Sequence, residues 1–281
     1  MEGIPTVFQI SFRLPDNSQD SRITTFVHLP PQLIRFMKKI ILLFFIFFQM
    51  GLVAQETLKE SGSWWTLGNK FQVSDQLSFS QISQMRRVGF MEHTQVILLK
   101  PSVNFKATKS LSFGLGYVYF KSFPNGVRHA SIKKEENRIW QHVTLSAKLG
   151  SISLSNRFVF EQRFKDVINN KVNPNVIDGT QYAQRLRYRL QLSFKVATIG
   201  NGRLLLGKIS NELRIRFKSG LSEPDYDQNN FRVLAGTSLI KNSSIWFGYG
   251  RDYNKINSEL FLANDIFLIS LNYDVDLRSK K

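Results

Sequence analysis

Arginine residues alternate with apolar residues in several segments of the second half of the chain. In segment 181–196, Arg185, Arg187 and Arg189 alternate with leucine and tyrosine side chains. Successive side chains of a strand point to opposite faces, so this spacing gathers the charges on one face. Guanidinium groups bind carboxylates and phosphates through paired hydrogen bonds. The candidate charge network from such segments comprises Arg138, Arg157, Glu161, Arg163, Arg185, Arg187, Arg189, Glu212, Arg214, Arg216 and Arg232.

A second candidate cluster is polar and centres on His142. Trp140 and Thr144 share its face of an alternating segment, and a histidine beside a hydroxyl and a carboxylate such as Glu161 could activate a nucleophile. The sequence has no Gly-x-Ser-x-Gly, His-Glu-x-x-His or phosphate-loop motif. An isolated histidine is more often structural, so we predict that the protein is not an enzyme. The alternative is an outer-membrane hydrolase or acyltransferase that modifies lipids.

Metal and cofactor sites have little support in the sequence. The chain has no cysteine, which excludes disulfides, thiolate metal sites and a lipoprotein anchor. Asp225 and Asp227 carry oxygen ligands of the kind that Ca²⁺ prefers, but a polar loop followed by a strand explains them equally well. We therefore predict no metal and no cofactor.

The charged rows require long strands to position them. Eleven segments alternate with a period of two, at residues 62–72, 76–87, 92–106, 110–121, 136–149, 151–164, 181–196, 203–217, 230–241, 243–253 and 264–277. Most match the ~9–11 tilted residues that a strand needs to cross a bilayer. Short connections near 106–109, 150, 199–202 and 241–243 alternate with long polar ones at 122–134, 165–180, 218–229 and 254–263. Short turns at one rim and long loops at the other are typical of outer-membrane barrels.

Aromatic residues near the ends of these segments resemble the girdles found at membrane interfaces. They are Trp64, Trp65, Tyr117, Tyr119, Tyr249, Tyr253 and Tyr273. Together these features predict an all-β fold, an antiparallel up-and-down transmembrane β-barrel. Because single-chain bacterial barrels have even numbers of strands, eleven segments indicate about 12 strands, with 10 as the alternative.

The N-terminal part of the chain is typical of an export signal. Lys38 and Lys39 follow Met37 and precede an apolar run at 40–48, about half the length of a membrane-spanning helix. We predict a signal peptide at 37–54 that is cleaved after Ala54, and an outer-membrane barrel domain at 55–281. Residues 1–36 are interpreted as a misannotated or disordered extension, because a signal peptide works at the start of a chain.

Several segments resemble a known family. These are NRIWQHV at 137–143, SNRFVFEQRF at 155–164, QRLRYRLQLSF at 184–194, SNELRIRF at 210–217 and the stretches 62–87 and 229–253. They resemble the domain-of-unknown-function 2490 family over roughly 60–277. The resemblance implies an outer-membrane β-barrel of Gram-negative, Bacteroidetes-like bacteria, and it implies no activity.

The formal net charge of +17 raises the question of polyanion binding. Arginines enclosed by a barrel cannot lie along an accessible nucleic-acid surface, so we predict no nucleic acid. The expected partners are outer-membrane lipid, the barrel-assembly machinery, and lipopolysaccharide, which the basic residues Arg128, Lys133 and Lys134 could contact.

We predict an occluded, Arg/Glu-lined lumen with a structural or small-solute pore role. The first alternative is a porin-like channel that prefers anions, because the arginines outnumber the visible acids. The second is a soluble periplasmic barrel that binds a ligand, with its apolar faces inside and its arginines outside. Periodicity fits both topologies. The oligomeric state is open.

Overall fold

The computed structural model describes residues 8–10, 25–27, 56–217 and 221–278. The chain forms two compact units, Met1–Gln55 and Glu56–Lys281. In the first, β1 (Phe8–Ile10) and β2 (Thr25–Val27) pair antiparallel. The predicted signal peptide at 37–54 lies outside the described residues.

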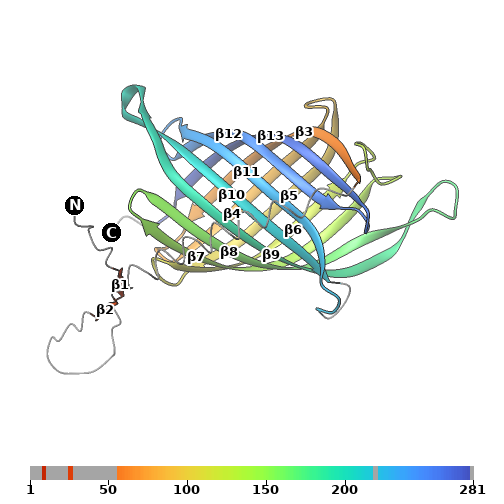
Figure 1. The fold of residues 1–281 in the computed structure, drawn as a ribbon, viewed down its shortest axis with the longest axis horizontal. Helices are drawn as coiled ribbons and strands as arrows, with labels where there is room; N and C mark the ends of the chain where they lie inside the picture. The colour runs from red at the N-terminus through yellow and green to blue at the C-terminus, as the bar shows by residue number, and fades with distance from the viewer. Residues whose placement is uncertain (1–7, 11–24, 28–55, 218–220, 279–281) are drawn as a thin grey trace. The chain divides into compact units, whose positions relative to one another are not determined.

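The second unit is a closed β-barrel (Figure 1). Its strands are β3 (Glu56–Gln72), β4 (Leu77–Val88), β5 (His93–Lys106), β6 (Leu111–Ser122), β7 (Lys134–Leu149), β8 (Ile152–Asn169), β9 (Val176–Ile199), β10 (Arg203–Phe217), β11 (Asp225–Ser238), β12 (Ser243–Lys255) and β13 (Leu260–Asp276). Strands that follow one another in the chain pair antiparallel, and β13 closes the barrel by pairing with β3. A 3-10 turn, η1 (Gly200–Gly202), joins β9 to β10. No described helix is long and apolar enough to cross a membrane.

The barrel confirms the all-β prediction but corrects its strand number and closure. The described barrel has eleven strands, so the expectation of 12 or 10 was wrong. An odd number of consecutively antiparallel strands leaves the first and last pointing the same way. The β13–β3 pair is therefore parallel, from Leu260↔Glu56 to Asp276↔Gln72, and the barrel is not wholly antiparallel.

The connections define two rims, which we call the short-turn rim and the long-loop rim. The short-turn rim holds the connections 73–76, 107–110, 150–151, 200–202 and 239–242. The long-loop rim holds 89–92, 123–133, 170–175, 221–224 and 256–259. Three predicted loops, 165–180, 218–229 and 254–263, proved too long, because their polar ends belong to strands. Polar residues on the inner side of a barrel strand look like loop residues in a sequence.

Alternation along the strands separates two chemically different surfaces. On β8 and β9 the outer face carries exposed Phe158, Leu186 and Tyr188, while Glu161 and Arg185 on the inner face are buried. Exposed apolar side chains continue around the outside on the other strands, for example Ile97, Leu115, Phe231 and Phe247. The outside of this barrel is apolar and its lumen is charged, the reverse of a water-soluble domain.

Side chains fill much of the lumen. One apolar cluster joins Val96, Leu98, Val118, Trp140 and Val159, and a second joins Trp64, Ile266 and Leu268. Trp64 was expected in an outer aromatic girdle, but it is buried inside. Aromatic residues near strand ends can occupy either face, so their type alone does not assign a side.

Two glycines of β6 make room for the rings inside. A Cβ at Gly114 would collide with the ring of His142, and a Cβ at Gly116 would collide with the ring of Trp140. Both rings belong to the register partners of these glycines on β7. The glycines thus allow the indole to lie flat against the barrel wall.

Candidate functional site: a charge network in the lumen

Glu161 lies at the centre of the charge network. Its side chain on β8 is 1% exposed. Oε2 accepts a hydrogen bond from Nε of Arg185 at 2.8 Å and lies 2.6 Å from Nη2 of the same arginine. Oε1 accepts a hydrogen bond from Nη1 of Arg187 at 2.5 Å. Arg185 also donates to Asp227 at 3.0 Å. One buried carboxylate therefore fixes two guanidinium groups, as enclosed charges require.

Glu212 of β10 extends the network around the wall. It accepts two hydrogen bonds from Nη2 of Arg187, at 2.8 and 2.9 Å, and one from Nε of Arg214 at 2.8 Å. Arg214 also donates to Gln228 at 2.8 Å. Arg187 thus bridges Glu161 and Glu212, which joins β8, β9 and β10 through their inner faces.

Two smaller groups complete the network. Glu136 of β7 accepts from Arg138 at 2.7 Å and from Arg163 at 2.5 Å. On the other side of the lumen Asp252 of β12 pairs with Arg232 and accepts from Asn230. Each of these buried carboxylates binds more than one donor, so the ion pairs form clusters and not isolated bridges.

Aromatic rings on the inner face hold several of the cations. The Arg86 guanidinium carbon lies 3.7 Å from the ring centroid of Trp64, and that of Arg138 lies 4.7 Å from the ring of Phe120. The quadrupole of an aromatic ring attracts a cation placed over its face. These contacts add to the ion pairs that cover the inner face of the wall.

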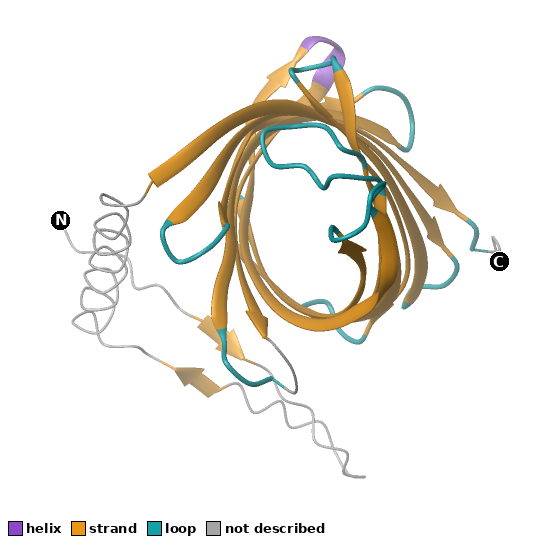
Figure 2. Cartoon of the chain, turned by 90° about the vertical axis from the view of Figure 1, so that its right-hand side faces the viewer, coloured by secondary structure: helices purple, strands orange, loops and turns teal. Residues whose placement is uncertain are grey.

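The β6–β7 loop is fixed to the wall at the long-loop rim. The buried Glu60 accepts from the backbone N–H of Val127 at 2.6 Å and from Gln95 at 2.9 Å. Asn125 donates to the carbonyl of Thr94 at 2.7 Å. Figure 2, which views the barrel from its long-loop end, shows loop segments crossing part of the opening. This loop narrows the entrance on that side.

His142 contacts an arginine and a tryptophan on the inner face of the barrel. Nη2 of Arg157 lies 3.1 Å from its Nδ1, and because arginine can only donate, Nδ1 must accept. The proton of the neutral ring is then on Nε2. The ring stacks on Trp140 at 5.3 Å between centroids, while Thr144 is the register partner of Arg157. The expected trio therefore lies together, but the hydrogen-bonding partner of the histidine is a guanidinium and not a hydroxyl.

The short-turn side of the lumen has a different charge balance. Arg157 and Arg189 face each other in the β8–β9 register, Lys100 lies 4.2 Å over the ring of Trp140, and Lys208 lies 3.4 Å over the ring of Trp246. None of these four makes an ion pair within the described part of the chain. The arginines of the network are thus paired with carboxylates, whereas the four cations beside it are not.

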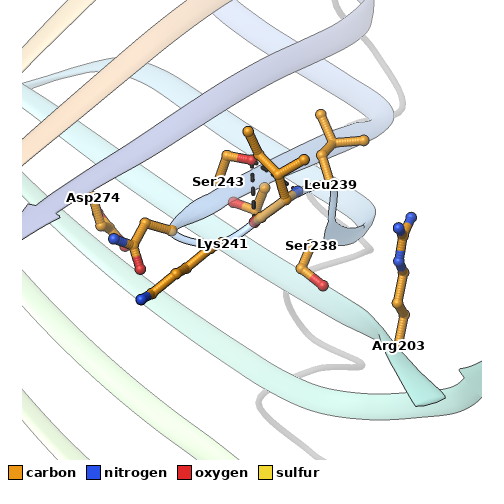
Figure 3. A pocket seen from close by; sticks show the side chains of 9 residues that line it. Arg203, Ser238, Leu239, Lys241, Ser243 and Asp274 are labelled. Carbon is orange, nitrogen blue, oxygen red and sulfur yellow. Dashed lines mark hydrogen bonds between the residues drawn. The ribbon is translucent and has the colours of Figure 1, made fainter. Parts of the chain in front are cut away.

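Two hollows open near the short-turn rim. The larger, of about 520 Å³, surrounds the β11–β12 turn, with Arg203 and Lys241 on opposite sides (Figure 3). Its Ser243 hydroxyl hydrogen-bonds the backbone of Ile240, so that group stabilises the turn. The second hollow, of about 330 Å³, is lined by Lys70, Lys106 and Lys109 with serine, threonine, asparagine and glutamine side chains.

The sequence identified the arginines more completely than their partners. The structure joins Arg138, Arg163, Arg185, Arg187, Arg214 and Arg232 to carboxylates, and Arg216 pairs with Asp225 near the rim. It leaves Arg157 and Arg189 outside the ion pairs. Sequence reasoning missed Glu136, Asp252, Arg86 and Lys100. Glu136 could have been found, because it is two residues from Arg138 and so lies on the same face of the strand. Asp227, considered as a calcium ligand, instead accepts from Arg185.

Comparison with known proteins supports the resemblance. The chain matches the family described as "Protein of unknown function (DUF2490)" over residues 61–261. It belongs to the DUF2490 family. The match runs from β3 into β13 and so includes the charge network. No curated protein and no solved structure matches the chain, and the family description carries no activity to transfer.

Proposed function

We propose that this DUF2490 protein is an outer-membrane β-barrel whose lumen is closed by the charge network, with a structural role or a role in passing only small solutes. The observation that carries the proposal is the reversed polarity of the barrel. Its outer face is apolar on strand after strand, while its arginines and carboxylates are buried inside. An apolar surface of this extent requires a cover, and a lipid bilayer fits a closed ring of long strands.

A soluble periplasmic barrel would need the opposite arrangement. It would bury the apolar faces and expose the arginines, but here Phe158 and Tyr188 are exposed and Arg185 is buried. The basic side chains Arg128, Lys133 and Lys134 are exposed in or beside the β6–β7 loop, a position that suits contact with lipopolysaccharide phosphates. Secretion through the signal at 37–54 and insertion by the barrel-assembly machinery are part of the same proposal.

The burial of inward-pointing side chains supports the closed lumen. Glu161, Trp140 and Ile266 are almost fully buried although all three point inward. Burial on the inner face means that side chains from different strands cover one another, so a continuous wide channel is not expected. The lumen would then admit water or small solutes at most.

The test is localisation followed by permeability. Expression from Met37 in a Gram-negative host should place the protein in the outer-membrane fraction, and unheated samples should migrate differently from heated ones on a gel. Liposomes that contain the protein should swell slowly in sugar solutions compared with liposomes that contain an open porin. Recovery as a soluble periplasmic protein would refute the membrane proposal, and rapid swelling would refute the closed lumen.

A further inference from the structure

Two guanidinium groups face each other in the lumen without a carboxylate to neutralise them. Arg157 of β8 and Arg189 of β9 are direct register partners. The Nε atom of each is buried and has no hydrogen-bonding partner. Like charges directly opposite on neighbouring strands destabilise a sheet, so a bound anion would stabilise this arrangement.

The nearest carboxylates are occupied by other arginines. Glu212 is the register partner of Arg189 on β10, but its two oxygens accept from Arg187 and Arg214. Glu161 lies four residues further toward the long-loop rim along β8 and accepts from Arg185 and Arg187. The charge of Arg157 and Arg189 is therefore left for a ligand.

Further cations and neutral donors surround the pair. Lys100 and Arg157 both lie over Trp140, at 4.2 and 5.3 Å from its centroid. Gln191 and Ser210 are register partners next to Arg189. Glu212, the register partner of Arg189, is the acidic neighbour of the pair and is bound to Arg187 and Arg214. An anion at the pair would meet two guanidinium groups, with Lys100 beside them over the same indole ring. This favours a multivalent anion over chloride.

The pair connects with the more open, basic end of the lumen. Ser112, Thr144, Arg157 and Arg189 are successive register partners on β6, β7, β8 and β9. Ser112 also lines the 330 Å³ hollow at the short-turn rim, together with Lys70 and Lys106 and with no acidic residue. Basic and hydroxyl side chains therefore lead from this rim to the pair, whereas ion pairs block the other direction.

We propose that Arg157 and Arg189 form a binding site for a phosphate-class oxyanion that enters the lumen from the short-turn rim. Paired guanidinium groups match the geometry of phosphate oxygens, and the hydroxyl-rich approach suits either phosphate itself or a phosphorylated polar solute. The site rests on the barrel and its inner face and does not depend on where the protein resides. Its failure would leave the outer-membrane proposal standing.

The first experiment titrates inorganic phosphate into the folded barrel in detergent at constant ionic strength. Calorimetry should show saturable binding, and the tryptophan fluorescence should change with it, because Arg157 lies over the ring of Trp140. Arg189→Gln should weaken binding by about tenfold or more, the usual scale for losing a hydrogen bond to a charged group, and adding Arg157→Gln should abolish it. Arg251→Gln removes an exposed arginine and should bind as the wild type does.

Folding of the variants is checked by heat-modifiable migration and by the urea midpoint. The Nε of the Arg189 side chain has no hydrogen-bonding partner, so Arg189→Gln should fold even if the double variant does not. Absence of saturable binding by the folded wild type, or equal binding by Arg189→Gln and Arg251→Gln, overturns the site. A hexose phosphate that binds more tightly than phosphate would identify a phosphorylated solute as the ligand, and equal affinity would identify phosphate itself.

Discussion

Neutralising Glu161 should destabilise the barrel more than any exposed charge change. Its carboxylate accepts from Arg185 and Arg187 at 2.5–2.8 Å and is 1% exposed. In Glu161→Gln the amide oxygen can still accept, but the amide nitrogen confronts a guanidinium. Removing one partner of a buried ion pair costs about 3–5 kcal/mol. Both arginines keep a second carboxylate, so we expect the lower end, about 3 kcal/mol, or roughly two orders of magnitude in the unfolding equilibrium.

The assay is urea unfolding of the refolded barrel in lipid vesicles, followed by heat-modifiable migration. The matched control is Glu135→Gln, which breaks the exposed pair with Lys121 and should cost less than about 1 kcal/mol. Glu161→Gln combined with Arg187→Gln should recover part of the loss, because the excess charge is removed. Equal midpoints for Glu161→Gln and Glu135→Gln would show that the network does not stabilise the barrel.

Three further predictions test the wall, the loop and the outer face. Gly116→Ala forces a methyl group into an indole ring and should lower the free energy of unfolding by about 1–3 kcal/mol, whereas Gly200→Ala, which meets nothing within 4 Å, should not. Glu60→Gln removes the charged acceptor that holds the β6–β7 loop, and limited proteolysis should cut that loop faster. Phe158→Arg, near the middle of β8, should lower the free energy of unfolding in a bilayer by about 2–4 kcal/mol. Ile152→Arg, at the rim, should lower it by less. Equal losses for the two variants would contradict the bilayer assignment.

Two-residue periodicity predicted the strands because it reports a local property, the alternation of side chains across a wall. All eleven alternating segments correspond to barrel strands. The number of strands was nevertheless wrong, since the even-number rule was given more weight than the segments themselves. Closure depends on contacts between the two ends of the barrel, and the parallel register of Leu260 with Glu56 leaves no trace in local alternation.

The charge network was predictable only in part, for the same reason. The alternation of side chains along a strand places Arg138 and Arg185 inside the barrel. Which carboxylate binds which arginine depends on the register of the strands and on how far each side chain extends to its neighbours. Asp227 resembles a loop residue until β11 is known to begin at Asp225. Trp64 shows the complementary error, because an aromatic residue near a strand end was assigned to the outer face and lies inside.

An excess of arginines over acids does not by itself predict an anion channel. A carboxylate has two oxygens with about four acceptor sites, and Glu136, Glu161 and Glu212 each accept from two arginines. Counting residues one for one therefore overstates the number of arginines that lack a carboxylate partner, although the net charge stays positive. The feature that favours an anion is the pair of unpartnered Nε atoms of Arg157 and Arg189. Because the pair lies beside the closed charge network, an anion would bind there and would not pass through the lumen.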